Sequence, residues 1–226
     1  MYSIIFLAGV SFLACLALTP LVRIWSERQG LVDRPNTKRK HHAAPTPRTG
    51  GIAIGLSYLV ALGLFLFSPL NGAASVNVPF AMGLVPAAIV VFMVGLLDDL
   101  VGLKSWEKLI GQVFAACLAY SGGVQVLGVA GYAAPGWWTL PITVVWLVAC
   151  SNAFNLIDGM DGLATGVGLF AAFTTLAAAL LNNNALLALA VAPLVGALLA
   201  FLRYNFNPAS IFLGDCGSLT DRKSVV

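Results

Sequence analysis

The sequence predicts an all-α, polytopic membrane protein, and three observations support this fold class. Hydrophobic residues make up 59% of the 226 residues and charged residues only 9%. The mean hydropathy is +0.92, whereas a soluble domain carries charge at roughly a quarter of its positions. Apolar runs of about 20 residues, long enough to cross the hydrocarbon core as helices, recur along the chain. Membrane β-strands are excluded because these runs are too long and do not alternate.

We expect seven transmembrane helices, one at each apolar run, over residues 3–23, 51–70, 78–97, 108–124, 137–153, 162–182 and 185–203. The first run has no basic residue before its apolar core and a strongly basic segment after it. We therefore interpret it as a retained helix and not as a signal peptide. A turn rich in Gly, Asn and Ser at 68–77 separates the second run from the third, which ends at Asp98-Asp99.

The later helices have equally distinct ends. A short apolar stretch at 124–132 separates the fourth helix from the fifth. Two Asp-Gly steps favour tight turns, so the fifth helix should end near Asn155 and the sixth should begin near Asp161. An Asn-rich turn at 182–184 leads into the seventh helix. The four Cys residues are scattered and match neither a disulfide framework nor a metal-ligand spacing, so we interpret them as packing residues.

The distribution of charge predicts the topology. With seven helices, all twelve Lys and Arg residues fall in the segments that follow the first, third and seventh helices. The positive-inside rule makes this side cytoplasmic in a bacterial inner membrane, with the N-terminus periplasmic. Five acidic residues meet at the same face: Asp98, Asp99, Asp158, Asp161 and Asp215. Transporters usually keep such groups near the bilayer midplane, so this pattern favours an interfacial enzyme that meets a soluble substrate and a lipid.

Asp98 and Asp99 end the third helix in the segment GLLDDLVGL. Negative charge at a helix C-terminus opposes the macrodipole, so helix capping does not explain the pair. Adjacent carboxylates also repel, which raises the proton affinity of one of them. The pair suits a general base, a nucleophile or a metal-linked acid. The alternative is a pair of solvated acids balanced by Lys104 and Lys108.

The segment NAFNLIDGMDGLATG, residues 152–166, carries two Asn and two Asp between apolar runs. Asn152 and Asn155 are three residues apart on one helical face and can point into a common pocket. Asp161 alone suits a helix N-cap equally well. That alternative does not account for Asn152, Asn155 and Asp158 together, so we expect a binding surface here.

Two further segments point to phosphate or metal binding. In FLGDCGS, residues 212–218, glycines flank Asp215 and let backbone approach a ligand closely, and a carboxylate oxygen suits Mg²⁺. Taken alone, this segment also fits an ordinary turn into a helix. The first basic loop ends in PTPRTGG at Gly51 and suggests a shaped phosphate-binding loop, although basic residues after a helix are often only a topology signal. The net charge of +3 gives no reason to expect nucleic acid.

These segments, in this order, resemble the polyprenyl-phosphate N-acetylhexosamine-1-phosphate transferase family. The resemblance rests on GLLDDLVGLKSWEKLIGQ, NAFNLIDGMDGLATG and FLGDCGS, and it extends to about Leu219. It implies that a UDP-N-acetylhexosamine and undecaprenyl phosphate react to give UMP and undecaprenyl-diphosphate-sugar. The PTPRTGG loop looks more like members that use UDP-GlcNAc than like phospho-MurNAc-pentapeptide translocases. The resemblance is to the bacterial branch of the family, and it implies an enzyme that starts O-antigen, common-antigen or teichoic-acid linkage synthesis.

The resemblance also implies roles for individual residues. Asp98 and Asp99 would be the catalytic pair beside the lipid phosphate. Asp215 would hold Mg²⁺, with Mn²⁺ as an alternative ion and Asn155 as a second ligand. The residues implied to bind the nucleotide sugar and its phosphates are Asn152, Asp158, Gly159, Asp161, Phe212, Lys108, Lys104 and Arg48.

The family continues beyond FLGDCGS with further helices and a His-rich loop, whereas polar residues follow here. We therefore expect residues 1–219 to form a transmembrane transferase domain that is incomplete at its C-terminus, and 220–226 to be a truncation or frameshift tail. Two alternatives stay open: a phospho-MurNAc-pentapeptide transferase, and a transporter or inactive scaffold with the same fold. The sequence also leaves open a homodimer, direct or covalent transfer, and which of Asp98 and Asp99 acts as the base.

Overall fold

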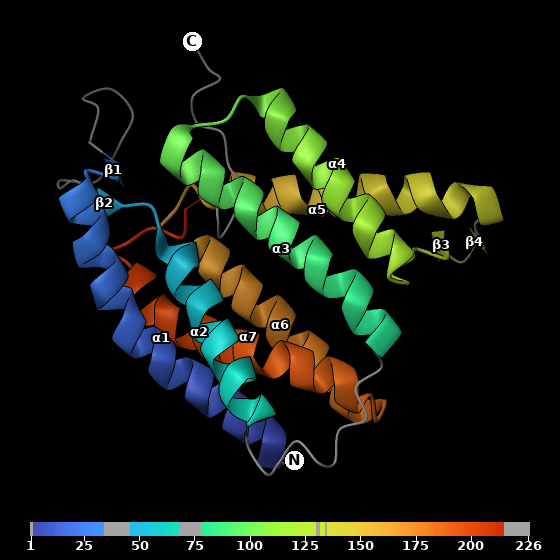
Figure 1. Cartoon of the computed structure of the whole chain (residues 1–226), viewed down its shortest axis with the longest axis horizontal. Coiled ribbons are helices and arrows are strands. Elements are labelled where there is room, and N and C mark those ends of the chain that lie inside the picture. Colours follow the sequence, from blue (N-terminus) through green and yellow to red (C-terminus); the bar gives the residue numbers. More distant parts are fainter. Residues whose placement is uncertain (1, 34–45, 68–77, 130–131, 134, 215–226) are drawn as a thin grey trace.

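The computed structural model describes residues 2–33, 46–67, 78–129, 132–133 and 135–214. Within this part of the chain the fold consists of α-helices, one short 3₁₀ helix and two small β-ribbons (Figure 1). The helices are α1 (Tyr2–Gln29), α2 (Gly50–Leu66), α3 (Val78–Val101), α4 (Ser105–Ser121), α5 (Thr139–Ile157), α6 (Leu163–Leu181) and α7 (Ala185–Asn205). The seven predicted helices are therefore confirmed, and α3 extends far enough to place Asp98 and Asp99 in its last turn.

The β-structure consists of two antiparallel ribbons of two-residue strands. Strand β1 (Val32–Asp33) pairs with β2 (Thr46–Pro47), and β3 (Gly128–Val129) pairs with β4 (Tyr132–Ala133). The 3₁₀ helix η2 (Gly136–Trp138) leads directly into α5. Neither ribbon is long enough to span a bilayer, for which a strand needs about nine residues or more.

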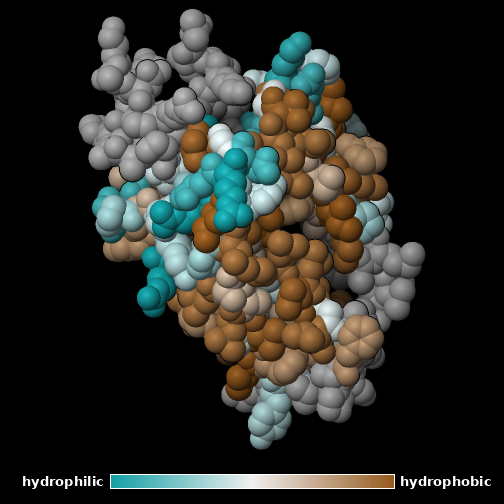
Figure 2. All heavy atoms as spheres, turned by 60° about the vertical axis from the view of Figure 1, so that its left-hand side comes forward, coloured by the Kyte–Doolittle hydropathy of each residue, from teal (hydrophilic) through white to brown (hydrophobic). Residues whose placement is uncertain are grey.

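Four of the described helices are long and apolar enough to cross a membrane: α1, α5 together with η2, α6 and α7. Helix α2 is apolar but shorter, and the 24 residues of α3 extend for roughly 36 Å. Figure 2 shows one face of the molecule, on which hydrophobic side chains cover a broad area while hydrophilic ones gather towards one end. Length and hydropathy thus confirm a multi-pass membrane protein.

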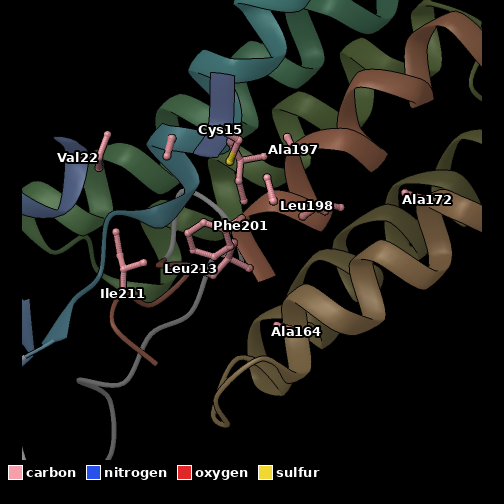
Figure 3. Packing of buried hydrophobic residues seen from close by; sticks show 12 residues of the cluster. Cys15, Val22, Ala164, Ala172, Ala197, Leu198, Phe201, Ile211 and Leu213 are labelled. Carbon is pink, nitrogen blue, oxygen red and sulfur yellow. The ribbon is translucent and has the colours of Figure 1, made fainter. Parts of the chain in front are cut away.

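Helices α1, α2, α6 and α7 pack around one hydrophobic core (Figure 3). Small residues allow close approach, as is common between membrane helices. A Cβ atom added to Gly196 of α7 would lie 2.1 Å from the carbonyl oxygen of Ala8 on α1. Phe201 of α7 is fully buried in this core, together with Ile211 and Leu213 of the segment that follows. The core therefore extends from the helices to the FLGD segment (residues 212–215), of which 212–214 are described.

Helices α3, α4 and α5 form a second group. A Cβ atom added to Gly111 of α4 would lie 2.5 Å from Cγ2 of Val94 on α3, so these two helices are in close contact. The hydroxyl groups of Tyr120 on α4 and Thr139 on α5 lie 2.8 Å apart. A Cβ atom added to Gly55 of α2 would lie 2.8 Å from Cε2 of Phe92 on α3, so the two helix groups meet between these helices. They also meet at one end of the bundle, where Gly214 lies beside Asp99 of α3.

Candidate active site

The FLGD segment is held by backbone hydrogen bonds to the end of the first basic loop. The N–H of Phe212 donates to the carbonyl of Pro47 at 2.8 Å. In return, the N–H groups of Gly50 and Gly51 donate to the carbonyls of Phe212 and Leu213 at 3.0 and 2.7 Å. The first N–H groups of a helix lack partners within the helix, so the carbonyls of this segment complete the N-terminus of α2. The predicted phosphate-binding loop and the predicted metal-binding segment are thereby joined.

Gly214 brings a third predicted segment to the same place. Its φ is +78°, a left-handed conformation that glycine adopts without strain. A Cβ atom added here would lie 1.6 Å from the carbonyl oxygen of Arg48 and 3.0 Å from Oδ2 of Asp99. Only a residue without a side chain allows this approach. Asp215, the predicted metal ligand, is the next residue and lies outside the described part of the chain.

A buried polar network fixes the segment that precedes Gly214. Asn205, the last residue of α7, is 1% exposed. Its Oδ1 accepts a hydrogen bond from Oγ1 of Thr165 on α6 at 2.7 Å, and its Nδ2 donates to the carbonyl of Ile211 at 3.0 Å. Asn205 thus links α6 and α7 to the FLGD segment through groups that are fully buried.

Asp161 also helps to hold the residues that follow α7. Its Oδ2 accepts a hydrogen bond from the N–H of Ala209 at 3.1 Å. The N-cap of α6 is Gly162, with φ +72° and no side-chain cap, so the alternative of Asp161 as an N-cap is wrong. Because its carboxylate supports the turn after α7, Asp161 connects the segment 152–166 with the FLGD segment.

The two acids at the end of α3 have different surroundings. The carboxylate of Asp98 lies 2.6 Å from Nζ of Lys108, and the two side chains are 9% and 5% exposed. The other oxygen, Oδ1, accepts a hydrogen bond from the N–H of Leu103 at 2.6 Å. The alternative of a solvated acid pair is therefore wrong for Asp98. Asp99 instead has its carboxylate beside Gly214.

Helix α4 is reversed in polarity compared with a helix of a soluble protein. Its buried face carries Lys108 and Gln112, whereas Trp106, Ile110 and Phe114 are exposed. Such a helix suits a position between lipid on one side and a polar site on the other. Lys104, immediately before α4, is exposed.

The two asparagines of α5 have different environments. Nδ2 of Asn152 donates to Oε1 of Gln112 on α4 and to the carbonyl of Val148, each at 2.8 Å. Asn155, one helical turn later, is 3% exposed. Asn152 therefore contacts α4 through Gln112, and a pocket common to Asn152 and Asn155 stays a prediction.

The remaining predicted residues lie on the same segments. Asp158 is the C-cap of α5 and is partly buried, and the next residue, Gly159, is exposed in the turn. Arg48 and Phe212 are partly buried. Both lie where backbone hydrogen bonds join the first basic loop to the FLGD segment. The structure thus brings the described members of the predicted set to one end of the bundle.

Sequence reasoning missed three residues that organise this end: Gln112, Thr165 and Asn205. Gln112 had a usable signal, because it follows Lys108 by four residues and a polar residue in a membrane helix usually has a function. Thr165 and Asn205 gave no comparable signal, since their bond depends on how α6 packs against α7.

The site offers oxygen ligands for a cation. Asp99 supplies a carboxylate beside the residue that precedes Asp215. Within the described ranges, no group of three His, Cys, Asp or Glu side chains could hold a metal ion. Mg²⁺ commonly uses one or two carboxylates and completes its shell with substrate phosphates and water. A carboxylate at Asp99, beside the residue that precedes Asp215, fits this way of binding Mg²⁺.

The predicted segments fall within the sequence model of a known protein family. Residues 81–220 match the family model described as "Glycosyl transferase family 4". The match includes the acid pair, the segment 152–166 and the FLGD segment. It covers the third to seventh helices and the site that they carry.

Curated relatives extend over almost the whole chain. A probable undecaprenyl-phosphate N-acetylglucosaminyl 1-phosphate transferase of Bacillus subtilis is 33% identical over 93% of this chain and 58% of its own length. A phospho-N-acetylmuramoyl-pentapeptide-transferase of Desulforamulus reducens is 35% identical over 96% and 71%. A decaprenyl-phosphate N-acetylglucosaminephosphotransferase of Mycobacterium tuberculosis is 35% identical over 88% and 52%. The chain thus spans between about half and three quarters of the length of these relatives.

The family match extends over more than half of the chain, and the relatives align with nearly all of it. The helices and the predicted segments lie within these matches. The chain therefore belongs to glycosyl transferase family 4, the family of these polyprenyl-phosphate sugar-1-phosphate transferases.

Proposed function

We propose that the protein transfers GlcNAc-1-phosphate from UDP-GlcNAc to undecaprenyl phosphate, giving UMP and undecaprenyl-diphosphate-GlcNAc. The main support is the approach of Asp99, Arg48 and Gly214, which joins three segments that are far apart in the sequence. A carboxylate, a basic loop and a backbone without a side chain meet there. This combination suits two phosphate groups that must approach each other.

The structure supports different roles for the two acids. The charge of Asp98 is balanced by Lys108 in a buried pair. We therefore assign to Asp98 the placement of Lys108, and to Asp99 the contact with the lipid phosphate, which it orients or deprotonates. Lys108 and Arg48 would offset the repulsion between the phosphates. The reaction exchanges one phosphoanhydride for another, so we expect it to be close to thermoneutral.

Mg²⁺ is the cation that we propose for this site, with Mn²⁺ as a substitute. Asp215 would be the principal ligand, and Asn155 the second. When bound, the ion would neutralise negative charge on the diphosphate. The residues of this chain supply the remaining functions: Asp99 handles the acceptor phosphate, and the Asp161 bond to Ala209 holds the FLGD segment in place.

The position of the site fits a substrate from each phase. Exposed apolar residues on α4, among them Trp106, Leu109 and Ile110, would face lipid near the acid pair. The Lys and Arg residues of the described helix ends lie at the same end as the site, which supports a cytoplasmic orientation in the inner membrane. Undecaprenyl phosphate would then reach the site from the bilayer and the UDP-sugar from the cytoplasm.

Two donor sugars have support. The PTPRTGG loop and the relatives from B. subtilis and M. tuberculosis favour GlcNAc-1-phosphate. The D. reducens relative, which shares 35% identity, supports phospho-MurNAc-pentapeptide as the second candidate. The product would begin the synthesis of a cell-envelope polysaccharide or of peptidoglycan, respectively.

The test is transfer of radiolabel by membranes that contain the protein. We expect membranes supplied with undecaprenyl phosphate and labelled UDP-GlcNAc to form a lipid-extractable product with Mg²⁺, and EDTA to abolish it. Labelled UDP-MurNAc-pentapeptide in a parallel reaction identifies the donor. A chain that binds neither donor and forms no labelled lipid would be a scaffold with the family fold, and the proposed activity would be rejected.

A further inference from the structure

Only one of the two polar groups of the buried Gln112 side chain has a hydrogen-bond partner among the described residues. The residue is 4% exposed. Its Oε1 accepts from Nδ2 of Asn152, but its Nε2 is buried with no hydrogen-bond partner among the described residues. An unmet buried donor is costly, and an apolar side chain of similar size would avoid that cost. Stability alone therefore does not explain a glutamine at this position.

Gln112 lies between two parts of the proposed site. It follows Lys108 by one helical turn, so the two side chains share the buried face of α4. Lys108 pairs with Asp98 on α3. On its other side, Gln112 holds Asn152 of α5, one turn before Asn155. Through two side chains, α4 thus connects the acid pair with the segment that begins at Asn152.

Little of helix α5 is buried by the rest of the described chain. In the most apolar 18-residue stretch of Gly136–Ile157, only 11% of the residues are buried. At the end distant from the site, the Thr139 hydroxyl lies 2.8 Å from that of Tyr120, and Thr143 accepts from the N–H of Val126 at 2.9 Å. At the end near the site, α5 meets α4 through Asn152 and Gln112. The hydrogen bond between Asn152 and Gln112 therefore contributes to the position of this end of α5 relative to Lys108.

We propose that Gln112 is a positioning residue: its side-chain carbonyl sets the placement of Asn152, and hence of the segment with Asn155 and Asp158, relative to the Lys108–Asp98 pair. This inference rests on the proposed function, because the placement matters only if both parts act on one substrate. A hydrogen bond that merely joins two membrane helices is the competing explanation.

The test is a reciprocal exchange that keeps charge and total length constant. Gln112→Asn shortens the acceptor so that it no longer reaches Asn152, and we expect kcat to fall about tenfold, as for other supporting residues. The KM for undecaprenyl phosphate should not change. The double variant Gln112→Asn/Asn152→Gln restores the combined length, and its kcat should return to within about threefold of the original. Gln125→Asn, the same change at an exposed position, should have no effect.

A second measurement does not depend on turnover. Spin labels at Val113 and Ala153, which are both exposed, report the distance between α4 and α5 after the native cysteines are replaced by alanine. We expect a narrow distance distribution in the parent chain, a broader one in Gln112→Asn, and a narrow one again in the double variant. A parent chain without turnover would count against the proposed function, while this distribution would still decide the role of Gln112.

Two results would overturn the inference. In the first, Gln112→Asn lowers the melting temperature but leaves kcat unchanged, which is the behaviour of a purely structural bond. In the second, the double variant has neither a restored kcat nor a narrowed distance distribution.

Discussion

Gly214 packs so closely against Arg48 that a Cβ atom on Gly214 would lie 1.6 Å from the carbonyl oxygen of Arg48. The same atom would lie 3.0 Å from the carboxylate of Asp99. The contact joins the end of the first basic loop to the FLGD segment, which is separated from it in the sequence by six α-helices, α2 to α7.

Gly214→Ala should therefore damage both stability and activity. A side chain in left-handed backbone costs about 1–2 kcal/mol, and the overlap with Arg48 adds about 1–3 kcal/mol. We expect a lower melting temperature in detergent and loss of most transfer activity. Gly63→Ala is the control, because an added Cβ atom there meets nothing within 4 Å. Equal melting temperatures for the two variants would contradict the close packing.

The Asp98–Lys108 pair should behave as a buried ion pair. Removing one partner leaves the other charge buried, so Asp98→Asn or Lys108→Met should each cost about 3–5 kcal/mol. The double variant should cost clearly less than the sum, as measured by thermal unfolding. Arg23→Met, which breaks the exposed Arg23–Glu27 pair, should cost at most about 0.5 kcal/mol. Additive losses at Asp98 and Lys108 would show that the two charges do not interact.

Thr165→Val should lower both the stability of the fold and the turnover of the enzyme. It keeps the shape of the side chain but removes the hydroxyl that donates to buried Asn205. We expect a loss of about 1–3 kcal/mol in the free energy of unfolding, together with reduced turnover, because Asn205 also holds Ile211. Thr174→Val is the control, since that hydroxyl is exposed and bonds only to its own helix. If both variants keep full turnover, Asn205 does not position the FLGD segment.

The topology can be tested at the turn between α6 and α7. The charge distribution predicts that Asn183 lies on the periplasmic side, opposite the proposed site. A reporter that is active only in the periplasm should therefore be active when fused at Asn183. The same reporter fused at Gly159, in the turn between α5 and α6, should be inactive. A reversed pattern would place the acid pair outside the cell and remove the proposed supply of the UDP-sugar.

The helices could be predicted from the sequence because each depends on local composition. Runs of apolar residues of bilayer length are sufficient to predict α1 and α7, and the Asp-Gly steps predict the turn between α5 and α6. The acid pair and the segment 152–166 were found for the same reason. Polar residues are conspicuous in an apolar chain.

The arrangement of the site could not be predicted, because it depends on backbone groups and on packing. The bonds from Gly50 and Gly51 to Phe212 and Leu213 use N–H and carbonyl groups that every sequence carries. Asp98 and Asp99 are chemically identical, and they differ only because consecutive residues point in directions about 100° apart on a helix. Which of them meets Lys108 depends on how α3 packs against α4.

We expect Asp99 to act on the acceptor phosphate at the junction of the three segments, whereas Asp98 holds Lys108. The most direct test is the turnover of Asp99→Asn with saturating UDP-GlcNAc and undecaprenyl phosphate. We expect kcat to fall by about 10²–10⁴-fold, the usual contribution of a general base, with little change in melting temperature. Turnover equal to that of the original protein would contradict it.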